Sequence, residues 1–258
     1  MDDREKEFFN QLLQLLTQID PWLTRIDPDS PRATVAPGSP LSTDNHRTDP
    51  YQTSYATWHS ISHAVDCLHM LRTTLRTGML HMYAPYSLVR GAMENASTAV
   101  WLLAPASRSE RVLRRLRLAA VDIHNGEKIK NLIGSVGPRS PEERREQIRD
   151  LAQRSSLDPK RALNRPGYGE IVASAGGHAP MGETIASLIW GICSAVAHGD
   201  FWSTVAVAAH DELPGAPAGI AHLRVTVNVE RLFFSTFFAL KMTEHAWRLF
   251  DERSRSPY

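Results

Sequence analysis

The stretch YSLVRGAMENASTAVWLLA, Tyr86–Ala104, decides the fold because it is the strongest helical segment of the sequence. Apolar side chains surround almost every turn, so this helix is expected to be buried. Arg90 and Glu94 lie four residues apart on one face, and Ser97 and Trp101 continue that face. A buried charge is costly unless it is paired and hydrogen-bonded. The polar face therefore predicts a partner.

The expected partner is the other mostly apolar helix, ETIASLIWGICSAVAHG, residues 183–199. One of its faces is small and polar, and its members are Ser187, Gly191, Ser194 and His198. The small side chains allow close approach, so we expect the two helices to face each other across their polar residues.

The N-terminal part of the chain divides into two segments. Residues 1–25 are expected to hold an amphipathic helix over Asp2–Ile19, ended by Pro21. Residues 26–50 hold five prolines without hydrophobic periodicity, which is typical of a linker. Such a linker allows the first helix to pack on its own subunit or on a neighbouring one, and the first arrangement is favoured. Residues 51–258 form the expected helical-bundle domain.

Helical periodicity recurs over 51–77, 107–133, 141–155 and 229–253. Residues 156–182 read as irregular, with at most a short helix over 170–175. Residues 201–209 and 220–227 alternate between apolar and polar side chains, which predicts a two-stranded hairpin. The fold class is therefore mainly α: a helical bundle of six to seven helices with one β-hairpin before the C-terminal helix. The apolar stripe of that last helix is wide enough for a core position or a homodimer interface.

Composition limits the classes of function. The net charge of +1 gives no global basic field for nucleic acid or an anionic membrane. No uncharged apolar run reaches the length of a membrane span, and no signal peptide is visible, so a cytoplasmic protein that does not enter the membrane is expected. The two cysteines, Cys67 and Cys193, lie in apolar helical contexts and read as buried thiols.

The first candidate site combines Arg90, Glu94, Ser194 and His198. In a functional interpretation Arg90 holds an anion, Glu94 orients a neighbour and His198 is the general acid or base, because it titrates near neutrality. In a structural interpretation Arg90 and Glu94 form a buried pair that fixes helix register. His198 then ends its helix, where a cation meets the dipole favourably.

The segments RGAMENASTAVWLL, RVLRRLRLAAVD and SAVAHG resemble a group of actinobacterial helical proteins that are similar to the HEPN superfamily. This superfamily comprises helical-bundle nucleotide-binding and ribonuclease domains. The resemblance implies a dimer in which an Arg and a His, separated by four to six residues on a late helix, form the ribonuclease site. His198 matches that histidine, but residues 191–194 are Gly-Ile-Cys-Ser, so the arginine is missing. Arg90 is the only replacement, from another helix.

Two further clusters carry chemistry. His59, His63, Asp66 and His69 share the helix over 51–77, and imidazole with carboxylate suits zinc, iron or manganese. This divalent metal site is the weaker interpretation, and an exposed histidine face without a cofactor is favoured. The arginines Arg111, Arg114 and Arg115 predict an electrostatic strip for RNA or, more simply, a solvated face.

We therefore expect a HEPN-like binding or interaction protein that lacks the complete ribonuclease motif. The alternative from a different class is an RNA-cleaving toxin or defence nuclease that uses His198 and Arg90. A metal-dependent bundle enzyme that uses His59, His63 and Asp66 is the third hypothesis. The expected partners are a second copy of the chain and RNA or a nucleotide.

Overall fold

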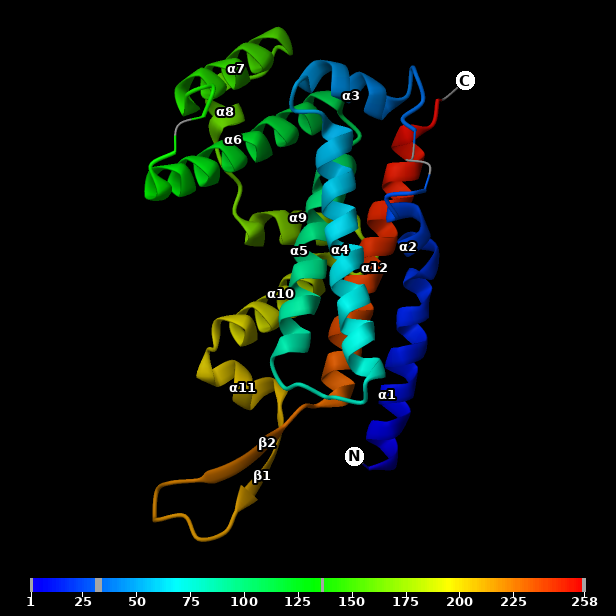
Figure 1. Cartoon of the computed structure of the whole chain (residues 1–258), viewed down its shortest axis with the longest axis vertical. Helices are drawn as coiled ribbons and strands as arrows, with labels where there is room; N and C mark the ends of the chain where they lie inside the picture. Colours follow the sequence, from blue (N-terminus) through cyan, green and yellow to red (C-terminus); the bar gives the residue numbers. More distant parts are fainter. Residues whose placement is uncertain (1, 31–33, 136, 257–258) are drawn as a thin grey trace.

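The computed structural model describes residues 2–30, 34–135 and 137–256, and these are mainly helical, as predicted. Three long helices run side by side at the centre: α4 (Thr53–Arg76), α5 (Ala84–Leu103) and α12 (Val229–Ser254) (Figure 1). The helix predicted over 86–104 is α5, and most of its side chains are buried. Its burial between the other two helices explains why its sequence is apolar nearly all round.

Helices α4 and α5 approach each other closely at a glycine. A Cβ atom placed on Gly91 would lie 2.9 Å from Sγ of Cys67, so a larger residue there would require the Cys67 side chain to move. Both cysteines are buried free thiols, as predicted. Burial raises the pKa of Cys67 to about 11 and that of Cys193 to about 12.

The N-terminal helix packs on its own subunit. The chain begins with α1 (Asp3–Leu15), continues through a 3₁₀ turn over Leu16–Ile19 and then forms α2 (Asp20–Ile26). The ring of Phe8 lies 5.6 Å from that of Phe233 on α12, measured between centroids. Pro21 starts α2 and does not end the helical segment, because a proline in the first turn lacks only an N–H that has no helical partner.

The segment predicted as a linker contains a helix, α3 (Pro40–Thr48), so the boundaries 26–50 do not mark an unstructured connection. The hydroxyl of Ser39 accepts a hydrogen bond from the backbone N–H of Ser42 and caps this helix. Leu41 and Asp44 are fully buried. Residues 31–33 of the predicted linker lie outside the described residues.

A second, smaller core lies at the upper end of the bundle in Figure 1. It is formed by α6 (Arg108–Ile133), α7 (Pro141–Arg154) and α8 (Pro159–Leu163). The next helices are α9 (Tyr168–His178) and α10 (Gly182–His198), which pack against each other and against α5. The region 156–182 is thus more regular than predicted, because α8 and α9 occupy most of it.

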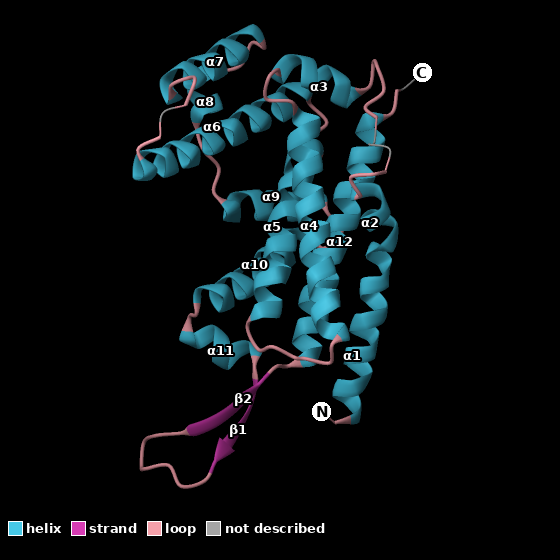
Figure 2. Ribbon diagram, in the orientation of Figure 1, coloured by secondary structure: helices cyan, strands magenta, loops and turns pink. Residues whose placement is uncertain are grey.

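Between α10 and the last helix the chain forms α11 (Phe201–Val207), then β1 (Ala209–Leu213) and β2 (His222–Thr226). The strands pair antiparallel with Ala209 opposite Thr226, which confirms the hairpin (Figure 2). The first predicted strand, 201–209, is wrong because most of it is α11. Its buried residues, Ser203 and Val207, are four apart as in a helix, and so short an apolar run does not distinguish the two periods.

The last helix, α12, belongs mainly to the core of its own subunit. Leu232, Ala239, Leu240 and Phe250 are buried there among many others. Among the described residues no helix is long and apolar enough to cross a membrane.

Candidate functional site

The polar face of α5 meets α10, as predicted, but through a different residue. One carboxylate oxygen of Glu94, Oε1, accepts a hydrogen bond from Nε of Arg90 at 2.8 Å and another from Nε1 of Trp190 at 2.8 Å. The side chains of Arg90 and Glu94 are 23% and 13% exposed. The contact between α5 and α10 is therefore a partly buried charged network of three side chains.

Tyr168 at the start of α9 also belongs to this neighbourhood. Burial and the nearby carboxylates of Glu94 and Asp122 raise the pKa of its hydroxyl, and Arg90 opposes the shift. Neither Tyr168 nor Trp190 was expected here from the sequence. The one sequence signal for Trp190 was its position. It lies four residues before Ser194, and residues four apart share a helix face, so Trp190 falls near the polar face of α10.

The other two members of the first candidate site lie apart from this network. Ser194 is half-buried and His198 is exposed at the C-terminal end of α10. Within the described residues neither makes a hydrogen bond or ion pair with Arg90 or Glu94. A single chain therefore does not assemble Arg90 and His198 into a bonded pair.

Replacing Glu94 by alanine is expected to lower the free energy of unfolding by about 1–2 kcal/mol, because Arg90 and Trp190 both lose their acceptor. Because Arg90 and Glu94 are partly exposed, the expected loss of stability is smaller than for a fully buried ion pair. Chemical denaturation measures the change. The Glu94→Gln variant keeps an acceptor oxygen and should lose less; equal losses in both variants would contradict the shared-acceptor geometry.

The three arginines predicted to contact RNA, Arg111, Arg114 and Arg115, are buried or bonded within the chain, so the geometry does not support the predicted strip. Arg111 is enclosed with Asp44, and Arg114 bonds to Glu110 and to the backbone oxygen of Trp101. Burial lowers the pKa of Arg115, and its Nε and Nη1 atoms make no hydrogen bond among the described residues. Arg111 and Arg115 recur at the four-residue spacing that continues to Ala119 and Ile123, so they share the core face of the helix.

The histidine face of α4 is largely solvent-exposed. His59, His63 and Asp66 are exposed, and His69 is half-buried. The rings of His59 and His63 lie 6.3 Å apart between centroids. In the described part of the chain no three His, Cys, Asp or Glu side chains are placed to hold a metal ion together. The metal hypothesis thus receives no support from the geometry.

An exposed apolar surface extends from the end of α10. We define the arm as residues 201–226, which comprise α11 and the hairpin. The hairpin projects beyond the lower end of the bundle, and its strands contact chiefly each other (Figure 1). Phe201 is 80% exposed and Trp202 is 57% exposed. A cavity of about 250 Å³ lies between α11 and the hairpin, and it is lined by Phe201, Thr204, Val205, His210, Ala221, Leu223 and Val225.

Comparison of the chain with protein-family models, with characterised proteins and with solved structures gives no match. The resemblance to HEPN proteins therefore remains a prediction that rests on short motifs. We therefore infer function from the geometry of the chain itself.

Proposed function

We propose that this protein is a HEPN-like helical-bundle binding module that associates with a second copy of itself through the arm. The observation that carries the proposal is the exposure of two neighbouring aromatic residues, Phe201 and Trp202, of which Phe201 lines an apolar cavity. Large apolar side chains clustered on a surface are typical of interaction sites. A two-stranded hairpin is also only marginally stable unless other structure covers it.

The arm is suited to a second copy because it presents both a projection and a hollow. In a two-fold symmetric interface the same patch serves both subunits, so each projecting ring needs a hollow on the same patch. Trp202 supplies the ring, and the cavity beside α11 supplies the hollow. The arm carries Asp211, Glu212 and Arg224 as its charged groups, so two copies meet with little like-charge repulsion.

The resemblance to HEPN proteins adds support, because it implies dimerisation around a late histidine. In this chain His198 ends α10 directly before the arm. Association through the arm would bring the His198 side chains of two copies to one interface. RNA cleavage that is lost in His198→Ala would make the ribonuclease hypothesis the better one.

Trp202→Glu is expected to raise the dissociation constant of the dimer by about 30-fold or more, because a central tryptophan contributes about 2 kcal/mol or more to an interface. Light scattering over a concentration series measures this change. Leu132→Glu, which places the same charge at a highly exposed leucine of α6, is the matched control and should leave the dimer intact. A wild-type chain that remains monomeric contradicts self-association and leaves the arm to a different protein.

A further inference from the structure

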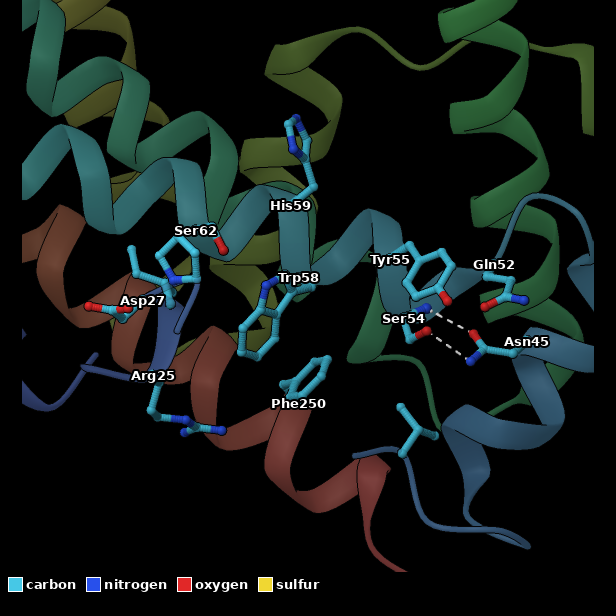
Figure 3. A pocket seen from close by; sticks show the side chains of 13 residues that line it. Arg25, Asp27, Asn45, Gln52, Ser54, Tyr55, Trp58, His59, Ser62 and Phe250 are labelled. Atoms are coloured by element: carbon cyan, nitrogen blue, oxygen red, sulfur yellow. Dashed lines mark hydrogen bonds between the residues drawn. The ribbon is translucent and has the colours of Figure 1, made fainter. Parts of the chain in front are cut away.

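A second cavity, remote from the arm in the fold, lies between the end of α2, α3, the first half of α4 and α12 (Figure 3). Its volume is about 580 Å³, within the range of about 300–1,000 Å³ that is usual for small-molecule sites. Neither the Glu94 network nor the arm contributes to its walls. The proposed self-association therefore leaves it without a role.

One wall of this cavity is a rigid aromatic surface. The ring of Trp58 meets Trp247 edge-on, with centroids 5.5 Å apart, and Phe250 at 5.6 Å. These contacts hold the indole in place from behind. Tyr55, one turn earlier on α4, also lines the cavity and is 69% exposed, so the cavity opens to solvent there. The arrangement offers a flat apolar face beside an entrance.

The charged and amide groups of the lining already have partners. Arg25 makes two hydrogen bonds to Asp251, at 3.1 and 2.6 Å, and its guanidinium lies 3.9 Å from the centroid of Trp247. Asn45 and Ser54 bond to each other in both directions, as Figure 3 shows. The exposed carboxylate of Asp27 leaves a negative charge in the lining, which disfavours an anion.

Two other hydroxyl groups in the lining, those of Ser62 and Tyr55, lack partners among the described residues. The Oγ atom of Ser62 is buried and makes no hydrogen bond among the described residues. The hydroxyl of Tyr55 also makes none there. A buried hydroxyl without a partner is costly, and a ligand acceptor would remove that cost. Among its described lining residues the cavity thus offers an aromatic face and hydrogen-bond donors, and its one arginine is already paired with Asp251.

We propose that this cavity binds an uncharged, planar aromatic molecule that carries hydrogen-bond acceptors. Its ring lies against Trp58, and its acceptors receive the hydroxyl protons of Ser62 and Tyr55. Coumarin is a suitable probe because it is flat, neutral and has oxygen acceptors but no donors.

The test follows the indole N–H signals of the six tryptophans in ¹⁵N-labelled full-length protein during a coumarin titration, with the Trp58 signal assigned from Trp58→Phe. We expect a saturable shift of the Trp58 signal and none of the Trp202 signal. Ser62→Ala should weaken binding about fivefold through the lost hydrogen bond. Ser87→Ala, at an exposed serine of α5, is the matched control and should leave the affinity unchanged.

Trp58→Ala should weaken coumarin binding about tenfold or more, but Trp58 also packs on Trp247 and Phe250. Tyr55→Ala is therefore the second variant, since its exposed side chain can be removed without opening the core, and it should weaken binding several-fold. A Trp58 signal that does not move, or coumarin affinity equal in wild type, Ser62→Ala and Tyr55→Ala, overturns the proposal. A shift with choline but not with coumarin overturns it in favour of a cation site.

Discussion

Asp44→Ala is expected to lower the free energy of unfolding by about 3–5 kcal/mol, because it leaves the buried charge of Arg111 without its carboxylate, with only the backbone oxygens of Pro105 and Ala106 as acceptors. The guanidinium donates from Nε to Oδ2 of Asp44 at 2.6 Å and from Nη2 to Oδ1 at 3.1 Å. The two side chains are only 3% and 0% exposed. Urea denaturation monitored by circular dichroism measures the loss.

The control for Asp44 is an exposed pair. On α12, Nζ of Lys241 lies 2.7 Å from Oε2 of Glu244, and the two side chains are 38% and 54% exposed. Glu244→Ala should change stability by no more than about 0.5 kcal/mol, because water screens such a pair. The double variant Asp44→Leu with Arg111→Leu removes both charges and should be more stable than Asp44→Ala alone. A denaturation midpoint of Asp44→Ala equal to that of wild type would contradict the buried pair.

Gly176→Ala is expected to cost about 2–3 kcal/mol, through overpacking between α9 and α10. A Cβ atom on Gly176 would lie 2.5 Å from the Cβ of Ala186 and 2.8 Å from the backbone oxygen of Gly182. Neither neighbour is the end of a flexible side chain, so the helices themselves must separate. Thermal and chemical unfolding both report the change.

The adjacent glycine of α9, Gly177, provides a control in which alanine is not expected to lower stability. Gly177 is exposed, and a Cβ atom there would meet no atom within 4 Å. Alanine is favoured over glycine within a helix by about 0.5–1 kcal/mol, so Gly177→Ala should leave stability unchanged or raise it slightly. Equal losses in the two variants would contradict the close approach of α9 to α10 as the cause, because helix propensity alone favours alanine at both positions.

Local patterns in the sequence predicted the long helices well. The helix over 86–104, the cap at Ser107 and the wide apolar stripe of α12 all depend on residues near one another in the chain. The meeting of α5 and α10 was also predictable, because a buried charged face needs a partner. The identity of that partner, Trp190, was not, since it depends on how two helices cross in space.

Longer-range pairings were hidden from local patterns. Asp44 lies in a proline-rich segment whose polarity is typical of a loop, and its role depends on Arg111, 67 residues away. The burial of Arg111 and Arg115 was hidden for a similar reason. The sequence alone does not distinguish an arginine on the core face of a helix from one on its solvated face. The cavity beside Trp58 joins four helices, so no single segment of the sequence indicates it.

The two native thiols have a practical consequence for labelling. Maleimides and spin labels react with the thiolate, and the raised pKa values of Cys67 and Cys193 leave almost none at neutral pH. Both sulfur-bearing side chains are also buried. A cysteine introduced on the hairpin would therefore be modified selectively without removing either native residue. Spin–spin distances between two such labels would report how two arms are arranged in a dimer.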